Sequence, residues 1–489
     1  MSALLATSIG VTCAAALTLP LAAPAPAAPV VRTSATQAAP VPTPVPALVP
    51  AEATESAEPS AAELPGSTQS LPLSPLTPAP TRATGTPTGP TASTGQGLRQ
   101  RDVRPFSLVG VVWDDADAEL HGTVQIRTRA TGTTKWSGWQ SLETHNGDHA
   151  ADAGSPERES GTVRGSTSPL WVGDSDGVEV HVHSESAGPR SGADGTAPLP
   201  AGLQVELVDP GDDPEQPRAD GTPAAGAPSA GTATPATAAQ PGALPESVAA
   251  AESSAVNADL APLGAAEISA LSKAESEEQA VVGAGAKPFV GPRPRIVTRK
   301  GWGADESLRE RTFAYTTTVK AAFVHHSATG NNYTCAQAPS VLRSIYRYHV
   351  KSSGWRDFGY NFAVDRCGNI YEGRAGGVSK AVLGAHTLGF NTNSMGVAVL
   401  GTFGSTNPPA AAVTAIAKLT AWKLGLFGRN PKGKVTLVSG GSGKYAKGAK
   451  VKLNVISGHR DGFATECPGI RLYRKLGTAR STSARLQGR

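Results

Sequence analysis

The uneven distribution of aromatic residues is the feature that most limits what this chain can fold into. None precedes Phe106, five lie from Phe106 to Trp171, and the other twenty begin at Phe289. Aromatic side chains supply much of the apolar burial of a core, so two regions can form one, at about residues 100–210 and at residues 289–478. The 55 glycines and 40 prolines, near a fifth of the 489 residues, indicate that much of the remainder packs into neither region.

The amino-terminal residues are typical of a secretory signal peptide. An apolar run at residues 3–22 is followed by prolines and small residues, and we predict a signal peptide at residues 1–28. The first basic residue is Arg32, so a misassigned start, a retained anchor and a buried helix of a cytosolic domain are the alternatives. No later stretch has the ~18 apolar residues that span a membrane. We therefore expect a secreted protein with no stable membrane span after signal removal.

Two segments have the composition of disordered linkers. Residues 29–103 are rich in Pro, Ala and Thr, with alternating prolines at positions 40–46, and this composition favours extended polyproline II over a core. Residues 211–288 are rich in Ala, Pro and Gly. We predict a spacer in the first segment and a linker in the second, with a transient amphipathic helix as an alternative for residues 247–282.

The region between these segments, residues 104–210, predicts an antiparallel, sandwich-like β-module. Trp136 and Trp139 lie close together in it and form either a sugar-stacking surface or part of the packing. His181 and His183 share one face of a strand and are either a metal pair or surface polar residues. The β-branched runs that predict its strands are separated by Gly, Asp and Ser turns and lie at residues 106–113, 123–129, 169–173, 177–185 and 202–210.

Residues 289–478 alternate strand and helix patterns, which predicts an α/β domain with a mixed central sheet flanked by helices. Residues 479–489 are predicted to be a basic tail. The predicted strands lie at residues 320–326, 394–403 and 455–460, the hairpins at 362–374 and 435–453, and the helices at 336–350, 409–426 and 470–476.

The C-terminal region is strongly basic. From residue 290 onward there are 30 Lys and Arg against 8 Asp and Glu, a net charge of +22, and the preceding residues carry −18, which leaves +4 for the chain. A basic domain favours polyanions such as nucleic acid, an anionic membrane or the anionic polymers of a bacterial wall. The sequence has no RNA-recognition or zinc-finger motif, so we expect no nucleic-acid partner. It has no HExxH motif, which argues against a zinc protease.

Histidine and cysteine residues in the C-terminal region indicate a metal site. Three of the four cysteines lie there, and an odd number cannot pair completely. Cys467 follows His459 by eight residues, and the motif FVHHSATG places two histidines at another strand end. Two histidines and a cysteine with one open position suit a catalytic zinc ion. Isolated histidines are more often structural, so spacing alone leaves both interpretations open.

Residues 293–478 resemble the peptidoglycan recognition protein family, also called the type 2 N-acetylmuramoyl-L-alanine amidases, to which an amidase-type phage lysozyme belongs. The resemblance covers most of the C-terminal domain and nothing before it. The motifs that carry it lie in the family's order and are RIVTRKGWGA (295–304), FVHHSATG (323–330), YRYHVKSSGWRDFGYNFAVDRCGNIYEGR (346–374), GAHTLGFNTNSMGVAVLGTF (384–403) and GHRDGFATECPG (458–469).

The resemblance implies that His325, His459 and Cys467 are the zinc ligands. His326 follows the ligand position, and neighbours on a strand point to opposite faces, so we do not expect both to bind one ion. The resemblance also implies that Tyr360 is catalytic. Thr465, two residues before Cys467, matches a position that is Lys in the phage enzyme and often Thr in animal amidases.

The implied activity is hydrolysis of the amide between the lactyl group of muramic acid and L-alanine, with peptidoglycan as the partner. We therefore expect the secreted protein to be associated with the cell wall. Zn²⁺ with three protein ligands keeps an open position and activates water. Tyr360 is expected to stabilise the negative charge on the carbonyl oxygen, and Thr465 to orient water. Positions that resemble those lining the family's substrate groove are His386, Thr387, Asn391 and Arg374.

Three alternatives remain open at this stage. Arg374 forms either a substrate contact or a structural salt bridge with Glu372 or Asp357. Cys335 and Cys367 flank the central helix and hairpin, and we predict a disulfide between them, with an additional zinc ligand as the alternative. The chain is either a secreted zinc amidase or a non-catalytic peptidoglycan-binding protein, and retention of the ligand cysteine favours the enzyme.

Overall fold

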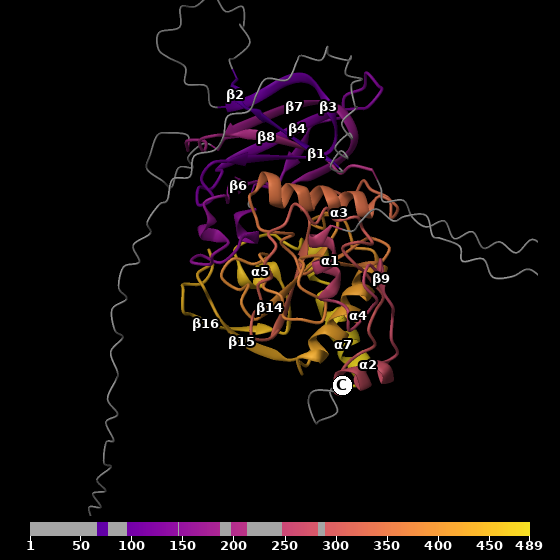
Figure 1. Cartoon of the computed structure of the whole chain (residues 1–489). Coiled ribbons are helices and arrows are strands. Elements are labelled where there is room, and N and C mark those ends of the chain that lie inside the picture. The colour runs from indigo at the N-terminus through magenta and orange to yellow at the C-terminus, as the bar shows by residue number, and fades with distance from the viewer. Residues whose placement is uncertain (1–65, 77–94, 145, 186–196, 213–246, 282–288) are drawn as a thin grey trace, which may run out of the picture. The chain divides into compact units, whose positions relative to one another are not determined.

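The computed structural model describes residues 66–76, 95–144, 146–185, 197–212, 247–281 and 289–489 (Figure 1). All of these residues belong to one compact unit of the chain. The predicted signal peptide lies outside the described residues. No helix in the described part of the chain is both long and apolar enough to cross a membrane.

The N-terminal module is an antiparallel sheet with the strand order β1-β8-β3-β7-β4-β5, and β2 and β6 pair with β3. Alternate residues of β3 face opposite sides, so Val109 and Val111 pack in the module's own core while Leu108 and Val112 face the C-terminal domain. The β-rich prediction for this region is confirmed. The strands are β1 (Ser67–Pro72), β2 (Ser74–Pro75), β3 (Gly95–Trp113), β4 (Gly122–Ala130), β5 (Gln140–Leu142), β6 (Gly165–Ser166), β7 (Leu170–Ser184) and β8 (Gln204–Asp209).

The predicted start of this module at residue 104 is wrong. β1 and β2 lie inside the predicted spacer at 29–103, and β3 begins at Gly95. β1 has no aromatic residue, and its placement depends on backbone hydrogen bonds to β8, in a register that pairs Ser67 with Asp209. Backbone pairing of this kind leaves little signal in the sequence.

The C-terminal domain is built on a mixed seven-stranded sheet with the order β17-β11-β14-β12-β13-β10-β9, as predicted. β11 is parallel to both β14 and β17, whereas β12 and β13 form an antiparallel hairpin. The strands are β9 (Glu267–Ile268), β10 (Ile296–Val297), β11 (Ala321–His326), β12 (Phe362–Val364), β13 (Ile370–Glu372), β14 (Ser394–Val399) and β17 (Ile456–Gly458), and β15 (Lys434–Val438) pairs with β16 (Lys450–Asn454) in the predicted basic hairpin.

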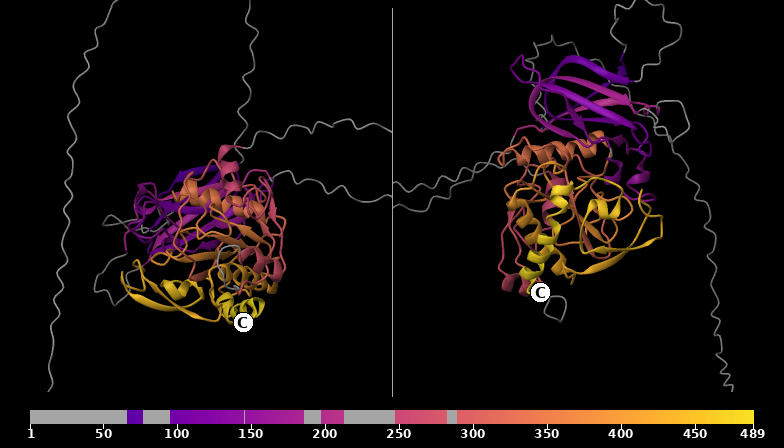
Figure 2. Two further views of the ribbon diagram at one scale, coloured as in Figure 1. Left: turned by 60° about the horizontal axis from the view of Figure 1, so that its bottom comes forward. Right: turned by 180° about the vertical axis from the view of Figure 1, so that it is seen from behind.

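Helices cover both faces of this sheet. Val397 and Val399 of β14 share a core with α4 and α7, whereas Ala398 shares one with α3. Figures 1 and 2 show α3 between the N-terminal sheet and the rest of the C-terminal domain. The helices of this domain are α3 (Ala338–Arg347), followed by a π-helical turn (Tyr348–Ser352), α4 (Ala410–Leu426), α5 (His459–Gly462), α6 (Ile470–Tyr473) and α7 (Leu476–Gln487).

The described residues of the predicted linker and of the predicted basic tail include helices and a strand. The predicted linker at 211–288 contains α1 (Val248–Ala255), β9 and α2 (Lys273–Val281), and the predicted basic tail at 479–489 forms most of α7. Neither has an apolar stripe. Their order comes from tertiary contacts, such as the hydrogen bond from Asn257 to Glu372 (2.9 Å) and the one between the Thr420 and Ser483 hydroxyls (3.1 Å).

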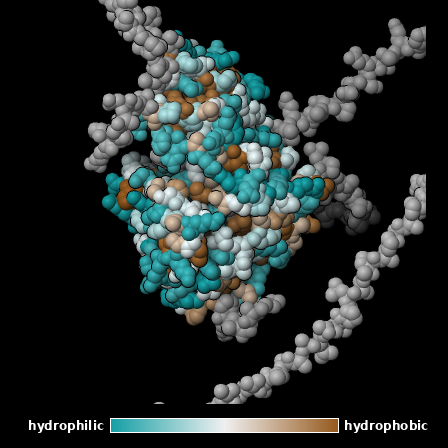
Figure 3. Space-filling model, turned by 90° about the vertical axis from the view of Figure 1, so that its left-hand side faces the viewer, coloured by the Kyte–Doolittle hydropathy of each residue, from teal (hydrophilic) through white to brown (hydrophobic). Residues whose placement is uncertain are grey.

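The N-terminal module and the C-terminal domain share one apolar core. Leu108, Val112 and Trp171 of the module are buried with Val341 and Ile345 of α3. The Tyr348 hydroxyl donates a hydrogen bond across this boundary to the Thr167 carbonyl (3.0 Å). The surface in Figure 3 is mainly hydrophilic, with hydrophobic side chains in small scattered areas, which is consistent with the cores being covered.

The structure contains the predicted disulfide between Cys335 and Cys367, whose Cα atoms are 6.1 Å apart and which are separated by 32 residues in sequence. We expect the double variant Cys335→Ser/Cys367→Ser to lose about 2–4 kcal/mol of unfolding free energy, because the unfolded chain regains the freedom of the closed loop. Denaturant unfolding measures this loss. A reductant should destabilise the wild type by the same amount and leave the variant unchanged, and equal midpoints for the two oxidised proteins would contradict the prediction.

Candidate functional site

The ends of two parallel strands bring the predicted zinc ligands together. His325 lies near the end of β11, and His459 follows β17 as the first residue of α5. Val324 pairs with Gly458, so each histidine comes one residue after a paired position, at the same edge of the sheet. The loop after α5 then returns the chain, and Cys467 Sγ lies 3.8 Å from His325 Nδ1.

A fourth residue joins this cluster from the N-terminal module. His149, His325, His459 and Cys467 are all buried, and each offers one ligand atom that lies within 4.8 Å of the others. The His149 ring is 4.4 Å from the His459 ring and 5.2 Å from the His325 ring, measured between centroids. His149 was not predicted from the sequence.

The hydrogen bonds of the cluster leave ring nitrogens facing its centre. His459 Nε2 donates to the Asp148 carbonyl (3.1 Å), and the buried Nδ1 atom of His459 has no hydrogen-bond partner among the described residues. His325 Nε2 lies 3.4 Å from Thr387 Oγ1, on the side away from the contact with Cys467. Metal-bound histidines usually have their outer nitrogen held in this way. The donor set of imidazoles and a thiolate fits zinc.

Burial sets the protonation of these groups. It lowers the pKa of His325 well below its ordinary value, and it lowers that of His459 to about 3, with His149 contributing. Both rings are therefore neutral at pH 7, the form that binds metals. Burial raises the pKa of Cys467 well above its ordinary value, so a bound cation would have to displace the thiol proton.

His326 lies apart from the cluster, as the alternation of side chains along a strand predicts. Its Nε2 atom is 3.4 Å from a carboxylate oxygen of Glu143, in the N-terminal module. The structure therefore groups His325, and not His326, with His459 and Cys467.

The two residues predicted to take part in catalysis lie beside the cluster. Tyr360 is buried with its ring 5.2 Å from that of His325, and burial raises the pKa of its phenol well above the ordinary value. The hydroxyl therefore stays protonated and is available as a donor. Thr465 Oγ1 accepts a hydrogen bond from the Cys467 amide (3.2 Å).

The four predicted substrate-binding residues are buried, and two of them contact the N-terminal module. Asn391 donates to the Ala150 carbonyl (3.0 Å) and to Asp152 Oδ1 (2.7 Å). Arg374 forms a bidentate ion pair with Glu157, at 2.7 and 2.8 Å, in place of the salt bridge with Glu372 or Asp357 that was its alternative.

His386 and Thr387 lie deeper in the C-terminal domain. Both of their backbone amides donate to Asn391 Oδ1, at 2.7 and 2.9 Å. The His386 ring is 5.3 Å from the His325 ring, and its Nδ1 atom is 3.0 Å from Thr387 Oγ1. In this structure both side chains therefore lie beside His325, within the C-terminal domain.

Residues 146–157 of the module cover the site, and we call them the covering segment. This role was not predicted from the sequence. The segment lies in the connection between β5 and β6. It matches no motif and has no periodicity. The available signal was the length of a connection rich in Asp and Glu, since long loops without regular structure are often functional.

The paired tryptophans of the module lie on its surface and not in its core. Trp139 is 40% exposed, and the Arg127 guanidinium lies over both rings, 5.5 Å from that of Trp136 and 5.0 Å from that of Trp139. The rings of His181 and His183 are 5.9 Å apart. Neither histidine belongs to a group of three or more metal-ligating side chains in the described part of the chain.

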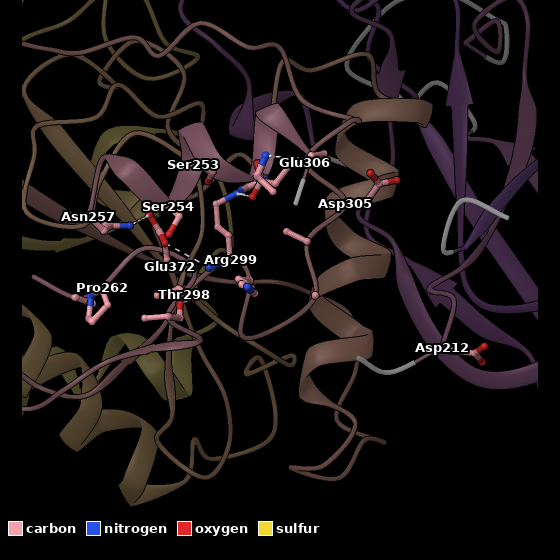
Figure 4. Close-up of a pocket in the computed structure, with 17 residues that line it drawn as sticks. Asp212, Ser253, Ser254, Asn257, Pro262, Thr298, Arg299, Asp305, Glu306 and Glu372 are labelled. Atoms are coloured by element: carbon pink, nitrogen blue, oxygen red, sulfur yellow. Dashed lines mark hydrogen bonds and ion pairs between the residues drawn. The ribbon is translucent and has the colours of Figure 1, made fainter. Parts of the chain in front are cut away.

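A separate cavity of about 380 Å³ lies beside α1 (Figure 4) and contains none of the predicted site residues. Several of its charged groups have hydrogen-bond partners: Arg299 Nε donates to Glu306 (2.7 Å), and Glu372 accepts from Asn257 (2.9 Å). Burial raises the pKa of Glu372 to about 7. This pairing indicates that the charged residues hold α1 and the preceding segments against the sheet.

Two protein families match the chain. The N-acetylmuramoyl-L-alanine amidase family matches residues 315–470, which include the three predicted zinc ligands. A family described as Rv3811 N-terminal galactose-binding domain-like matches residues 55–225. The second match covers β1 and β2, in agreement with the early start of the module in the structure.

Individual relatives match the C-terminal region. Peptidoglycan-recognition protein SC2 of Drosophila simulans is 30% identical over 185 residues, which are 37% of this chain and 85% of that protein. The N-acetylmuramoyl-L-alanine amidase of Homo sapiens is 31% identical over 193 residues, 38% of this chain and 28% of that protein. Among solved structures, wild-type Drosophila PGRP-LB is 25% identical and has a TM-score of 0.30, over 38% of this chain and 93% of its own.

The relative from Drosophila simulans matches over nearly its whole length, and the amidase family covers the buried cluster. Both names connect the C-terminal domain with peptidoglycan. The chain therefore belongs, through this domain, to the family of peptidoglycan recognition proteins and N-acetylmuramoyl-L-alanine amidases.

Proposed function

We propose that this chain is a secreted, zinc-dependent N-acetylmuramoyl-L-alanine amidase that cleaves the amide between the lactyl group of muramic acid and L-alanine in peptidoglycan. The observation that carries the proposal is the buried cluster of His325, His459 and Cys467, with the outer nitrogens of its histidines held by polar partners. The ligand set occurs together with Tyr360, and a protein that only binds wall fragments needs neither the thiolate nor a buried phenol.

Zinc in this cluster would polarise the scissile carbonyl and lower the pKa of a neighbouring water molecule. Tyr360 supplies a hydroxyl that stays protonated at neutral pH, because burial raises its pKa. Such a fixed donor stabilises the negative charge that builds on the carbonyl oxygen in the transition state.

Thr465 has a supporting role. Its hydroxyl oxygen accepts a hydrogen bond from the Cys467 amide, which fixes its position relative to the thiolate ligand. A hydroxyl of ordinary acidity is a poor base, so we assign it to orienting water and not to removing a proton.

The positive charge of the C-terminal domain supports association with the cell wall. The hairpin of β15 and β16 carries Lys434, Lys450 and Lys452, and Lys444 and Lys447 lie in the connection between these strands. Exposed cations attract anionic polymers over about one Debye length. We assign the stem peptide and muramic acid of peptidoglycan to the buried site, and the anionic wall polymers to this outer surface.

Zinc removal tests the metal assignment. Activity is measured on purified sacculi as new free L-alanine amino groups, with new reducing ends as a separate assay. The proteins assayed are the full chain and its His149→Ala variant, which lacks the cluster side chain that comes from the N-terminal module. Cys467→Ala, made in the full chain and in the His149→Ala variant, should abolish zinc binding and the release of free amines. A chelator should have the same effect on the two proteins that retain Cys467. Cys335→Ser/Cys367→Ser is the matched control, because it changes two cysteines outside the cluster. New reducing ends without free amines would refute the amidase assignment.

Removal of the Tyr360 hydroxyl tests its role. In the His149→Ala background, Tyr360→Phe should lower kcat by about 10²–10³, the usual loss for one donor to a developing oxyanion. Zinc content should stay equal to that of the parent, since the phenol is not a ligand. An unchanged kcat would show that Tyr360 does not act on the reacting carbonyl.

A further inference from the structure

We propose that the covering segment, residues 146–157, is a built-in inhibitory plug, with His149 as a fourth protein ligand of the metal and its carboxylates in the places of an acidic substrate. The chain is then made in a latent form, and cleavage requires the segment to leave the site. This inference rests on the proposed zinc amidase function of the C-terminal domain.

The number of ligating side chains in the cluster supports a closed metal site. Both ring nitrogens of His149 are buried and have no hydrogen-bond partner among the described residues, and the Nδ1 atom lies 2.8 Å from a carboxylate oxygen of Asp148. A buried ring with an unpaired nitrogen and a carboxylate close to it has the groups that a metal-bound histidine uses. Catalytic zinc keeps one position open, whereas zinc with four protein ligands is closed. With His149, the cluster offers four protein ligands.

The second argument is the occupation of the groove. Glu157 holds Arg374 through two hydrogen bonds, and Asp152 Oδ1 accepts from both Asn391 (2.7 Å) and the Gly389 amide (2.7 Å). The Asp148 carbonyl accepts from the Leu388 amide (2.9 Å). Two of the residues predicted to bind substrate are therefore already paired.

The groups of the covering segment that contact the C-terminal domain are those of a peptide with free carboxylates. Peptidoglycan stem peptides of the diaminopimelic acid type carry such groups. The covering segment presents three carboxylates and two backbone carbonyls to the C-terminal domain, with the His149 ring at the cluster. The carboxylates are those of Asp148, Asp152 and Glu157. It therefore competes with an acidic peptide for the same donors.

The third argument is that the segment can be released. The side chains of Arg374 and Glu157 are only 7% and 8% exposed, but a buried ion pair adds little net stability, because both partners lose their hydration. Ala153, Gly154 and Pro156 of the same segment are exposed. Polar contacts therefore hold the segment against the C-terminal domain. None of its residues belongs to an apolar core cluster of the described part of the chain.

The decisive variant is His149→Ala in the full chain, with the exposed His121→Ala of the same module as the matched control. Zinc affinity, measured by competition with a chelator, should fall at least about tenfold in His149→Ala, since loss of a group that only orients a ligand already has about that effect. The absorption spectrum of the cobalt-loaded protein should change with it, and His121→Ala should match the wild type in both. Neither readout depends on activity.

The rate of free-amine release from sacculi should rise in His149→Ala. A minor open state of about 0.1–10% in the wild type corresponds to a gain between about tenfold and a thousandfold. An unchanged cobalt spectrum and zinc affinity would overturn the ligand role of His149. A wild type that already cleaves as fast as the variant would overturn the plug, while the amidase proposal would stand.

Failure of the proposed function has a different signature. If the cobalt spectrum and zinc affinity change as expected but neither protein releases amines, the four-ligand site stands and the amidase assignment fails. If both proteins release amines at the same rate and their cobalt spectra are equal, the amidase assignment stands and the four-ligand site fails.

A second variant loosens the segment without touching the metal cluster. Asp152→Asn/Glu157→Gln removes the carboxylate charges that contact Asn391 and Arg374 and leaves that of Asp148 beside His459. Glu159→Gln, an exposed carboxylate just beyond the segment, is its control. The double variant should release amines at least about tenfold faster than the wild type, and the control should not. Equal rates in all three proteins would contradict the substrate-like role of these carboxylates.

Discussion

The apolar contact between β3 and α3 determines how the site is assembled. Because alternate residues of β3 face opposite ways, one strand serves the module's own core through Val109 and the shared core through Leu108 and Val112. Full burial of such side chains contributes about 1.5–3 kcal/mol each. The contact fixes the module against the C-terminal domain, and the connection between β5 and β6 then reaches the buried cluster of His325, His459 and Cys467.

The charge difference between the two parts of the chain acts within the molecule as well as outside it. The C-terminal region carries +22 and the preceding residues −18. In the structure, carboxylates of the covering segment meet Arg374 and the polar groups around Asn391. Arg374 and its polar neighbours, for which we propose an acidic polymer as substrate, are thereby matched by an acidic segment of their own chain. The net charge of +4 conceals this complementarity.

Much of the C-terminal fold could be predicted, since its strands and long helix have strong local patterns, such as the apolar run of β14 and the helix from Pro409 to Leu426. His325, His459 and Cys467 followed from motifs. β1 and α7 could not be predicted, because they have no aromatic residue or apolar stripe and depend on contacts with distant elements. A helix at residues 247–282 was predicted only as an alternative, and α1 and α2 lie within that range. His149 could not be predicted either. It reaches the cluster only because two regions far apart in sequence share a core, and no local pattern encodes that.

The central claim is that the N-terminal module closes the metal site of the C-terminal domain. A crystal structure of the zinc-loaded full chain, with the ion located by its anomalous scattering, tests this most directly. The account predicts one zinc ion bound by His325, His459, Cys467 and His149, with Glu157 on Arg374. Zinc bound by the three C-terminal ligands and a water molecule, with His149 elsewhere, would contradict it.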